Sequence, residues 1–394
     1  MGLVPQMVKV YMFVNVAWFF VSHRLPIATE ARERGYDMTV LADMTDRCPQ
    51  FFTEGFKFSR STIRRRSGVL RVLFDFYKTF KLILNANVDI LHAVPAKPIL
   101  FIGITAVLLR KPFIASVSGL GPAFSKDGIF GLFRRAVVVR LYKIIFSNPR
   151  SRVIVQTDHD REVLLGSGIC ASNQVETIRG SGVDLDQFNV SDSNYSSVKT
   201  NADRNLHVLS ASRLLSDKGI MEYLQAADMM RAEGSDAQFL LAGPFDHESP
   251  TALDEAYIHA QCKSTGVRYL GNVTDMAALL KTIDLFVYPT YYPEGLPKIL
   301  LEVAAAGIPV VTTNHPGCRD AVVNGQSGIL VEPRNASDLK RACSQLLADE
   351  LLRDRMSRFS VAHARTNFDV KQVVEKHFAL YEKLVGSITS HRDS

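Results

Sequence analysis

Two carboxylates in the second half of the chain lie where a polar ligand could bind. Residues 283–288 (IDLFVY) form a short apolar run, which is typical of a strand buried on both faces of a parallel sheet. Glu294 follows this run, and Glu302 comes eight residues later. Because eight residues make about two turns of helix, we expect both carboxylates on one side of a helix. Carboxylates accept hydrogen bonds from hydroxyls and a helix N-terminus attracts phosphate, so the site suits a ligand with both groups.

The elements around these glutamates are expected to be a strand, a helix and a second strand. Pro297 suits the first turn of the helix because its missing N–H costs nothing there. Gly307 and Pro309 end the helix at about residue 306, and the next strand begins at Val310. Strands and helices alternate along the whole chain, which indicates the α/β class. We expect further strands at residues 8–14, 38–41, 89–93, 113–117 and 152–156, and helices at 22–34, 128–146 and 370–384.

A pair of cations, Arg213 and Lys218, lies at another predicted strand end. The two residues are five apart, between a strand that begins near residue 206 and a helix that follows Gly219. Arg can donate two hydrogen bonds to neighbouring oxygens, whereas Lys acts as a point charge. By spacing alone the two cations, like the two glutamates, could be solvated surface residues. The apolar neighbours of Glu302 (ILLEVAAAG) favour a functional role for that carboxylate.

The segment EGLPKILLE, which contains both glutamates, resembles the E-x7-E motif of retaining glycosyltransferases of the GT-B fold, in the large family 4 group. Residues 206–219, 239–244 and 269–273 resemble the next family segments in order, and residues 316–333 resemble its loop-and-hairpin segment. The resemblance covers nearly all of the second half and is looser in the first. It implies an α/β protein of the GT-B fold, with two Rossmann-like domains facing a deep cleft between them. The implied domains are 1–180 for the acceptor, 181–368 for the nucleotide sugar, and 369–394 as a helix that crosses back.

The resemblance also assigns roles to individual residues. It implies that Arg213 and Lys218 hold the donor diphosphate and that Glu294 binds hydroxyls of the transferred sugar, so these three are the predicted catalytic residues. The other predicted donor-binding residues are Gly243, Gly271, Val273, Gly295, Leu296, Pro297 and Glu302. Fixed cations and N–H groups would then stabilise the leaving diphosphate, with no metal and no cofactor. We discount the D-x-D in residues 182–188 as a metal site for this reason.

The first half carries the predicted acceptor site. The aromatic stretch 15–21 is expected to be a loop, and no G-x-G-x-x-G accompanies it, so a nicotinamide fingerprint is absent. Many family members have a His after the strand equivalent to residues 113–117, whereas this chain has S-G-L-G, which resembles a subgroup that extends lipid-linked sugars. His23 or His92 could replace that His, although a lone His is more often structural. The predicted acceptor-binding residues are Asn15, Trp18, His23, Ser118 and Gly119.

Charge is distributed unevenly along the chain. Residues 1–150 carry 22 Lys and Arg against 9 Asp and Glu, and the remainder carries 24 against 31. Such a basic half indicates an anionic partner, either an acidic membrane surface or nucleic acid. Arg134, Arg135, Arg140 and Lys143 edge the apolar residues of the predicted helix 128–146, which suits an interfacial helix. The alternative is a core helix with solvated arginines. Residues 59–80 are also basic and aromatic.

The remaining features bear on where the protein works. We find no apolar run of about 20 residues that could span a bilayer. The apolar run at residues 10–21 lacks the flanks of a signal peptide. Five scattered cysteines, at positions 48, 170, 262, 318 and 343, indicate a reducing cytoplasm. We therefore expect a cytoplasmic protein that is peripherally associated with the inner face of the membrane.

These observations predict a hexosyltransferase-type enzyme. It would move a sugar from a UDP-sugar (UDP-GalNAc, UDP-GlcNAc or a UDP-hexose) to a polyprenyl-diphosphate-linked glycan with retention, and it would bind no nucleic acid. The alternatives are a nucleotide-sugar epimerase, a glycan phosphorylase, or a non-catalytic module that binds membrane or nucleic acid. An epimerase needs no acceptor, so product formed from the UDP-sugar alone would favour it. The presence of all four residues, Arg213, Lys218, Glu294 and Glu302, speaks against a non-catalytic binding module.

Overall fold

The computed structural model describes residues 7–43, 56–61, 63, 69–124, 128–188 and 205–392, which fall into two compact units. The first unit combines Met1–Ser181 with Val370–Ser394, and the second is Gly182–Asp369. The predicted polar segment 192–204, Cys48 and part of the basic stretch 59–80 lie outside the described residues.

A seven-stranded parallel sheet forms the centre of the first unit, in the order β3-β2-β1-β4-β5-β6-β7. Its strands are β1 (Lys9–Val16), β2 (Asp37–Asp43), β3 (Lys57–Arg60), β4 (Ile90–Ala93), β5 (Phe113–Val117), β6 (Ser151–Val155) and β7 (Val175–Thr177). Successive side chains of a strand point to opposite faces, so the apolar runs bury both faces of the sheet. In β1, Val10 and Met12 pack on one face and Phe13 packs on the other.

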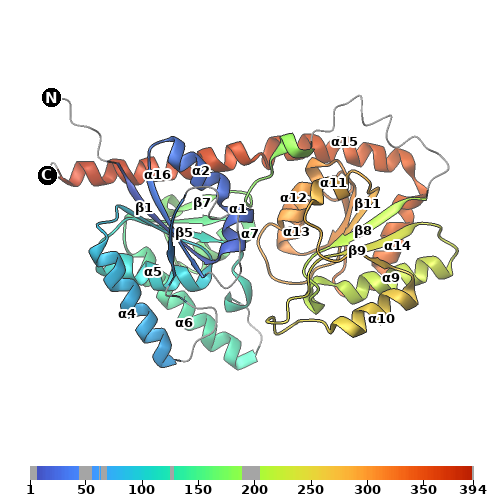
Figure 1. Cartoon of the computed structure of the whole chain (residues 1–394), viewed down its shortest axis with the longest axis horizontal. Coiled ribbons are helices and arrows are strands. Elements are labelled where there is room, and N and C mark those ends of the chain that lie inside the picture. The colour runs from blue at the N-terminus through green and yellow to red at the C-terminus, as the bar shows by residue number, and fades with distance from the viewer. Residues whose placement is uncertain are drawn as a thin grey trace. The chain divides into compact units, whose positions relative to one another are not determined.

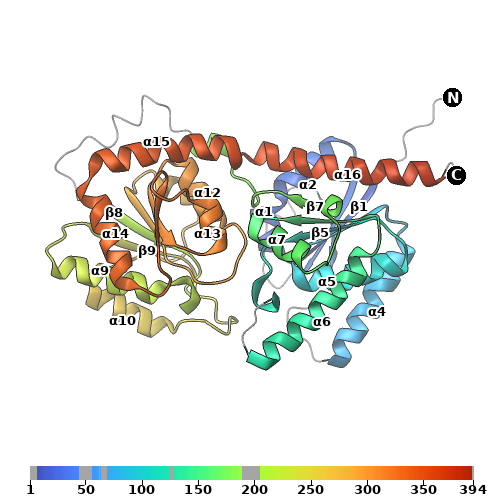
Figure 2. The same ribbon diagram turned by 180° about the vertical axis from the view of Figure 1, so that it is seen from behind.

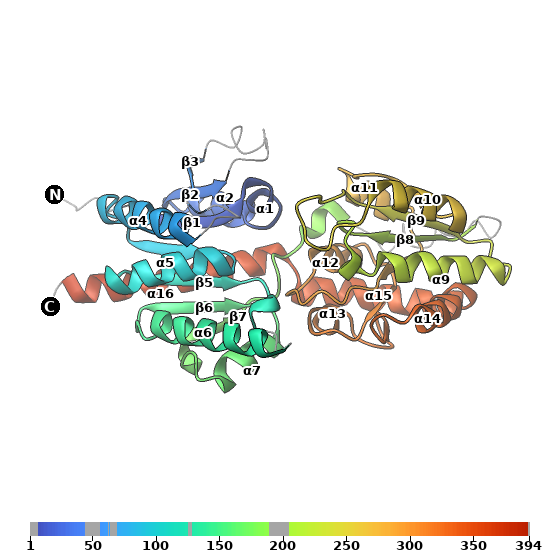
Figure 3. The same ribbon diagram turned by 90° about the horizontal axis from the view of Figure 1, so that it is seen from below.

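Helices cover both faces of this sheet (Figures 1 and 2). One layer contains α1 (Ala17–His23), α2 (Leu25–Glu33) and the C-terminal helix α16 (Val370–Arg392). The other contains α4 (Val69–Asn85), α5 (Ala96–Leu108), α6 (Gly128–Phe146) and α7 (Asp158–Gly166). Figure 3 shows α5 between α4 and α6 in this second layer. The buried side chains of Phe378, Tyr381 and Leu384 make α16 part of the first unit's core.

The second unit contains a six-stranded parallel sheet in the order β10-β9-β8-β11-β12-β13. Its strands are β8 (His207–Ala211), β9 (Gln238–Ala242), β10 (Arg268–Tyr269), β11 (Leu285–Tyr288), β12 (Val310–Thr313) and β13 (Gly328–Val331). Its helices are α9 (Ile220–Ala232), α10 (Glu255–Thr265), α11 (Met276–Leu280), α12 (Lys298–Ala305), α13 (Pro316–Ala321), α14 (Ala336–Ala348) and α15 (Glu350–Asn367). Phe286 of β11 packs on one face of the sheet and Val287 on the other.

The α/β class is confirmed, and several predicted elements occur where the pattern placed them. The strand at 113–117 and the helix at 128–146 have the predicted bounds. The aromatic stretch 15–21 was expected to be a loop, and this is wrong, because Ala17–His23 is the helix α1. No capping residue indicates its start, since Val16 at the N-cap offers no side-chain hydrogen bond. The buried side chain of Phe20 fixes the helix to the core.

Three further predictions about element boundaries are wrong. The helix expected at 22–34 is interrupted at Arg24, because Pro26 fits only the first turn of a new helix, α2. The glutamates do not share a helix, because Pro297 at the N-cap is extended and α12 begins at Lys298. Residues 316–333 form no hairpin. They form α13, which has Pro316 in its first turn, and then β13, which runs parallel to β12.

Candidate functional site

The connections in the second unit bring two predicted loops together. The strand order reverses between β8 and β11, because the chain adds β9 and β10 on one side of β8 and β12 and β13 on the other side of β11. Loops that leave the carboxyl ends of such neighbouring strands diverge and leave a crevice for ligands. Arg213 and Lys218 follow β8, and Glu294 follows β11. The topology therefore places these three side chains at one edge of one sheet.

Lys218 is held in place by the short 3₁₀ turn Ser216–Lys218 and by the glycine after it. Gly219 has a φ of 73°, and a Cβ there would lie 2.2 Å from the carbonyl oxygen of Pro289. Only glycine allows the β8 loop to approach the β11 loop this closely. The side chain of Lys218 is consequently buried, with 4% of the residue exposed.

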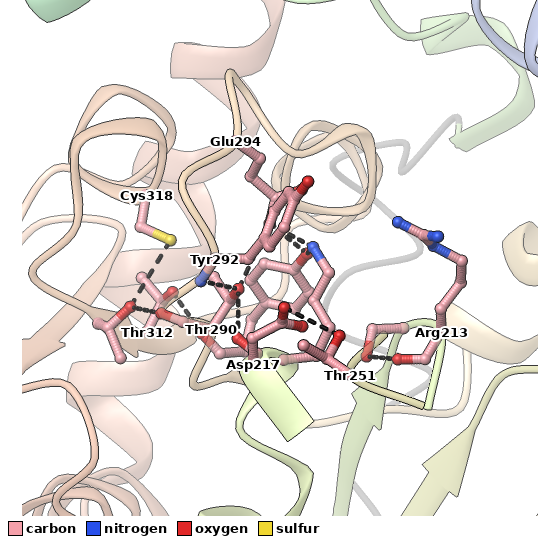
Figure 4. A network of polar contacts seen from close by, with 12 residues as sticks. Arg213, Asp217, Thr251, Thr290, Tyr292, Glu294, Thr312 and Cys318 are labelled. Atoms are coloured by element: carbon pink, nitrogen blue, oxygen red, sulfur yellow. Dashed lines mark hydrogen bonds and ion pairs between the residues drawn. The ribbon is translucent and has the colours of Figure 1, made fainter. Parts of the chain in front are cut away.

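Glu294 and Lys218 form the centre of a buried polar cluster (Figure 4). Lys218 Nζ donates to Glu294 Oε1 at 2.6 Å and to the hydroxyl of Tyr288 at 3.1 Å. The Tyr288 hydroxyl in turn donates to Glu294 Oε1 at 2.9 Å, and Thr290 Oγ1 lies 3.4 Å from the same oxygen. Burial and the nearby Glu294 carboxylate raise the pKa of Tyr288 well above its ordinary value. Tyr288 therefore stays neutral and orients both charged groups.

The ring of Tyr292 adds to the same cluster. Lys218 Nζ lies 5.1 Å from the centre of this ring and 5.5 Å from the centre of the Tyr288 ring. An ammonium group at this distance is attracted by the ring faces. The two aromatic rings and the carboxylate together hold the lysine side chain at the strand ends.

Arg213 lies on the other side of the β8 loop and pairs with a different carboxylate. Its Nη1 atom is 2.7 Å from Asp246 Oδ2, and both side chains are half-buried. Asp246 follows β9 and the Gly243 turn, so this ion pair links the loops after β8 and β9. Each of the two predicted diphosphate-binding cations thus contacts a carboxylate of the protein.

Glu302 lies in α12, separate from the Glu294 cluster. Its carboxylate is 3.3 Å from Lys298 Nζ, one turn earlier in the helix. Burial raises the pKa of Glu302, and Lys298 opposes this rise. The carboxylate is therefore half-buried with one cation beside it, and its free oxygen can accept a ligand hydroxyl.

The remaining predicted donor-binding residues line the same sheet edge. The N–H of Gly243 donates to the carbonyl of Gly271 at 2.8 Å, which joins the loops after β9 and β10. Val273 is partly buried against the core. The Gly295, Leu296 and Pro297 turn is buried, and a Cβ on Gly317 of α13 would lie 2.0 Å from the carbonyl oxygen of Gly295. This close contact fixes the turn that carries Glu294.

The predicted acceptor residues lie in the first unit at the carboxyl ends of β1 and β5. Asn15 is in β1, and Trp18 and His23 are in α1, where Trp18 is exposed and the ring of His23 stacks on Phe19 at 4.4 Å. Ser118 and Gly119 follow β5, and Gly119 has a φ of 95°. Parallel strands bring these residues to one edge of the first sheet.

His92, one of the two candidates to replace the family's histidine, is a core residue. It is fully buried, and its ring nitrogens are 2.7 Å from the hydroxyls of Tyr381 and Ser116. Burial and the nearby His377 and Arg24 hold its pKa well below the ordinary value. His92 therefore cannot contact an acceptor in this conformation, and its interpretation as an acceptor group is wrong.

Two findings bear on metals and membranes. Within the described part of the chain, no group of three or more His, Cys, Asp or Glu side chains is arranged to hold a metal ion. In the same part, no helix has both the length and the apolar character needed to cross a bilayer.

Sequence reasoning missed two important members of the cluster, Tyr288 and Asp246. Tyr288 ends an otherwise apolar strand, and this position at the carboxyl edge of a sheet is a usable signal for a site residue. Asp246 gives no such signal, because its contact with Arg213 spans 33 residues and depends on the pairing of β8 with β9.

The cluster suits a ligand that carries both phosphates and hydroxyls, and solved structures share this arrangement of sheets. HepE from Anabaena, determined in complex with UDP, aligns with a TM-score of 0.74, over 96% of this chain and 100% of that chain, at 18% identity. The fold is therefore that of the GT-B glycosyltransferases.

The sequence comparisons agree with the fold. Residues 192–361 match the model of glycosyl transferases group 1, and residues 9–156 match a glycosyl transferase 4-like model. An N,N'-diacetylbacillosaminyl-diphospho-undecaprenol alpha-1,3-N-acetylgalactosaminyltransferase from Campylobacter jejuni is 27% identical, over 95% of this chain and 99% of that protein. The capsular polysaccharide glycosyltransferase CapM from Staphylococcus aureus is 27% identical over 43% and 44%. This chain belongs to the group 1 glycosyltransferases and is a hexosyltransferase-type enzyme.

Proposed function

We propose that the protein transfers a sugar from a UDP-sugar to a polyprenyl-diphosphate-linked glycan, with retention of the anomeric configuration. The donor sugar is an N-acetylhexosamine or a hexose. One observation carries the proposal: Lys218, Glu294 and Tyr288 form a single buried cluster at the strand ends. The name of the Campylobacter relative supports a lipid-linked diphosphate acceptor, and the complex of HepE supports a uridine donor. The acceptor is thus a growing surface or precursor glycan.

The paired charges indicate how the donor would bind. Lys218 contacts Glu294 and Arg213 contacts Asp246, so the four side chains carry no net charge together. A donor diphosphate supplies the oxygens that both cations need. When it binds, Lys218 exchanges Glu294 for phosphate oxygens, and the carboxylate of Glu294 accepts hydrogen bonds from sugar hydroxyls. Glu302, half-buried in α12, accepts hydrogen bonds from the ribose hydroxyls.

The chemical step needs no protein nucleophile in this proposal. The bond between the sugar C1 and the diphosphate oxygen breaks, and the acceptor oxygen forms a bond to C1 on the same face. The proton of the acceptor hydroxyl moves to the leaving phosphate oxygen. Lys218 and Arg213 stabilise the negative charge that grows on the diphosphate, which is the largest electrostatic demand of the reaction.

The first unit supplies the acceptor side in this proposal. Asn15, Trp18, His23, Ser118 and Gly119 contact the acceptor glycan, and the exposed Trp18 suits the apolar face of a sugar ring. The basic first half holds the enzyme against the acidic inner face of the cytoplasmic membrane. There it meets an acceptor that the lipid confines to the bilayer.

Thermal stabilisation by nucleotides tests the donor site directly. We expect UDP and UDP-sugars to raise the melting temperature of the wild-type protein, and GDP and ADP to raise it less. The Lys218→Ala protein should lose the UDP shift. A protein that no nucleotide stabilises would contradict the proposal.

Product analysis tests the reaction. Incubation of a UDP-sugar with a diphosphate-linked acceptor should give one glycoside whose anomeric configuration matches that of the donor, as measured by NMR. A new sugar nucleotide formed without acceptor would instead identify an epimerase.

A further inference from the structure

Helix α4 exposes the side chains that a helix normally buries. Its buried residues Asp75, Thr79 and Ile83 recur every four positions and face the core of the first unit. Its outward face contains Leu73, Phe74, Tyr77 and Leu84, whose exposed fractions are 62%, 49%, 59% and 56%. The inward face is apolar as well, since it includes Phe76 and Ile83, whereas a surface helix usually has polar residues on its outward face. Exposed apolar side chains that gather on one face usually indicate an interaction surface.

The inward face of α4 is well packed, so the outward residues are not displaced from a loose core. Phe76 lies 6.1 Å from the ring of Phe101 in α5, and Ile83 is fully buried. The buried carboxylate of Asp75 lies 3.7 Å from Arg71 Nε. Thr79 donates to the carbonyl of Asp75 at 2.7 Å. The polar residues on the inward face therefore have partners, and the helix orientation is fixed.

Cations flank the exposed apolar residues of α4. Arg71, Lys78 and Lys81 are exposed, and Asp75, the only acidic residue between Val69 and Asn85, is buried. Lys78 Nζ lies 4.5 Å from the centre of the Phe74 ring. Long basic side chains beside apolar ones let the apolar groups enter a lipid layer while the charges reach the headgroups.

Helix α6 also exposes apolar and basic side chains. It lies in the same layer as α4, on the far side of α5 (Figure 3), and both helices pack their inner faces on one core. Its outward side chains include Phe133, Val137 and Ile144, with Arg140 and Lys143 beside them. We define the α4–α6 surface by its exposed residues: Arg71, Leu73, Phe74, Tyr77, Lys78, Lys81 and Leu84 in α4, and Leu132, Phe133, Val137, Arg140, Lys143 and Ile144 in α6.

A pocket of about 180 Å³ opens beside α4 at the carboxyl ends of β2 and β3. Arg60, Arg71 and Lys78 line it together with Ser61 and Phe74. The carboxylates of Asp43 and Asp75 also line the pocket, so its three cations leave a net positive charge. A phosphate group suits this combination of cations and a hydroxyl.

We propose that the α4–α6 surface binds an anionic phospholipid bilayer, that the outward apolar face of α4 inserts among the lipids, and that the pocket at Arg60 takes a headgroup phosphate. The inference rests on the membrane association in the proposed function and identifies the surface that makes it. Charge complementarity selects this occupant, because the surface contains five cations and no exposed acid among its defining residues. An acidic leaflet attracts each of these cations.

Vesicle sedimentation of the full chain tests this surface. The probes are vesicles of phosphatidylcholine alone and vesicles in which part of it is replaced by phosphatidylglycerol. Wild-type protein should sediment with the anionic vesicles and much less with the neutral ones. Lys78→Glu with Lys81→Glu should lower the partition coefficient about twentyfold or more, and Arg60→Ala about fivefold. Leu73→Ser with Tyr77→Ser should lower it about tenfold.

Matched controls lie in the second unit. Lys263→Glu reverses an exposed charge in α10, and Leu351→Ser removes an apolar side chain that is 76% exposed at the start of α15. Both controls should sediment like the wild type. Every variant should keep its thermal shift with UDP, because the UDP site lies in the second unit. This shift reports folding of the second unit, separately from membrane binding.

Four outcomes would overturn the inference. The α4 variants could sediment like the wild type, or the controls could lose binding equally. Loss of binding only in Phe133→Ser with Ile144→Ser would leave membrane association standing and assign it to α6 alone. Wild-type protein that binds duplex DNA at about 0.15 M salt and ignores anionic vesicles would overturn both the surface and the membrane association.

Discussion

The two units of this glycosyltransferase differ in the partners of their buried and half-buried cations. In the second unit, Lys218 and Arg213 each contact a carboxylate, at 2.6 Å and 2.7 Å. In the first unit, Arg24 is 2% exposed, and none of the ion pairs formed among the described residues includes it. Its ionisable neighbours are neutral: Tyr381, His92 and His377. Burial lowers the pKa of Arg24 to about 10.

This difference separates a binding site from a structural core. A cation paired with a carboxylate near a strand end can exchange that partner for phosphate, so the pair is ready for a ligand. A cation enclosed by neutral rings has no carboxylate partner to exchange for phosphate. Such a cation affects only the stability of the fold. Burial and, to a smaller extent, the nearby charge of Arg24 lower the pKa of His377 to about 3. We therefore expect changes at Lys218 and Arg213 to alter transfer, and changes around Arg24 to alter stability.

The largest expected effect is on transfer, in Lys218→Ala. Loss of the cation removes stabilisation of the leaving diphosphate, so kcat/KM should fall by about a thousandfold. Steady-state transfer assays would measure this, with circular dichroism to confirm the fold. Lys263→Ala, an exposed lysine of α10, is the control and should transfer normally. Near-normal turnover in Lys218→Ala would break the comparison, because Lys218 would then be a structural cation like Arg24.

The next effect concerns the pH stability of the first unit. Folded His377 stays neutral down to about pH 3, whereas an unfolded histidine binds a proton below about pH 6.5. Between these values the unfolded state binds more protons, so the free energy of unfolding falls as the pH is lowered. The stability that neutral His377 contributes is fully present above about pH 6.5. At pH 5 the loss should be about 2 kcal/mol.

The only tryptophan, Trp18, lies in the first unit, so its fluorescence during urea unfolding reports that unit. His377→Phe should reduce the dependence of stability on pH between 7 and 5, and the part that buried His92 contributes should remain. His259→Phe, at an exposed position of the second unit, should leave it unchanged. An equal slope in wild type and His377→Phe would contradict the role of His377.

Tyr288→Phe should lower transfer less than Lys218→Ala does, and it tests the surroundings of the paired lysine. The variant removes the hydroxyl that contacts both Lys218 and Glu294, so their positions are less well defined. We expect kcat/KM to fall about tenfold. Tyr223→Phe is the matched control, because this buried hydroxyl donates to the carbonyls of Val208 and Leu240 away from the site. It should lower the melting temperature and leave transfer intact. Equal transfer rates in the two variants would contradict the assigned role of Tyr288.

The smallest effect is expected in Asp246→Asn. Asp246 competes with a bound diphosphate for Arg213, and removal of its charge should strengthen UDP binding about fivefold. Isothermal titration calorimetry would measure the Kd. Asp236→Asn, at the opposite edge of the same sheet before β9, should bind UDP like the wild type. Weaker binding in Asp246→Asn would mean that Asp246 positions Arg213 for the donor.

Much of the second unit could be predicted because its signals are local. Short apolar runs identify β8 and β11, and Lys218 and Glu294 follow them within a few residues. The order of strands then brings them together, and this order follows from the alternation of strands and helices. The ion pair between Arg213 and Asp246 could not be predicted, because it depends on how two separate loops leave the sheet.

The first unit was predicted less well for physical reasons. A residue pattern gives the period of a helix but not which of two apolar faces points to the core, so the exposed apolar face of α4 was not expected. In α1, Phe20 is held by core packing that no capping signal accompanies. The two glutamates shared a spacing compatible with one helix, but the extended backbone at Pro297 placed Glu294 in a loop.

The contribution of α16 to the first unit has a consequence for synthesis on the ribosome. The first unit needs Phe378, Tyr381 and Leu384 in its core, yet all seven strands of its sheet lie within the first 181 residues. The second unit is continuous from Gly182 to Asp369. Although its residues are translated later, its own core is complete first. The earlier half must wait, with part of one apolar face of its sheet uncovered, until α16 has left the exit tunnel.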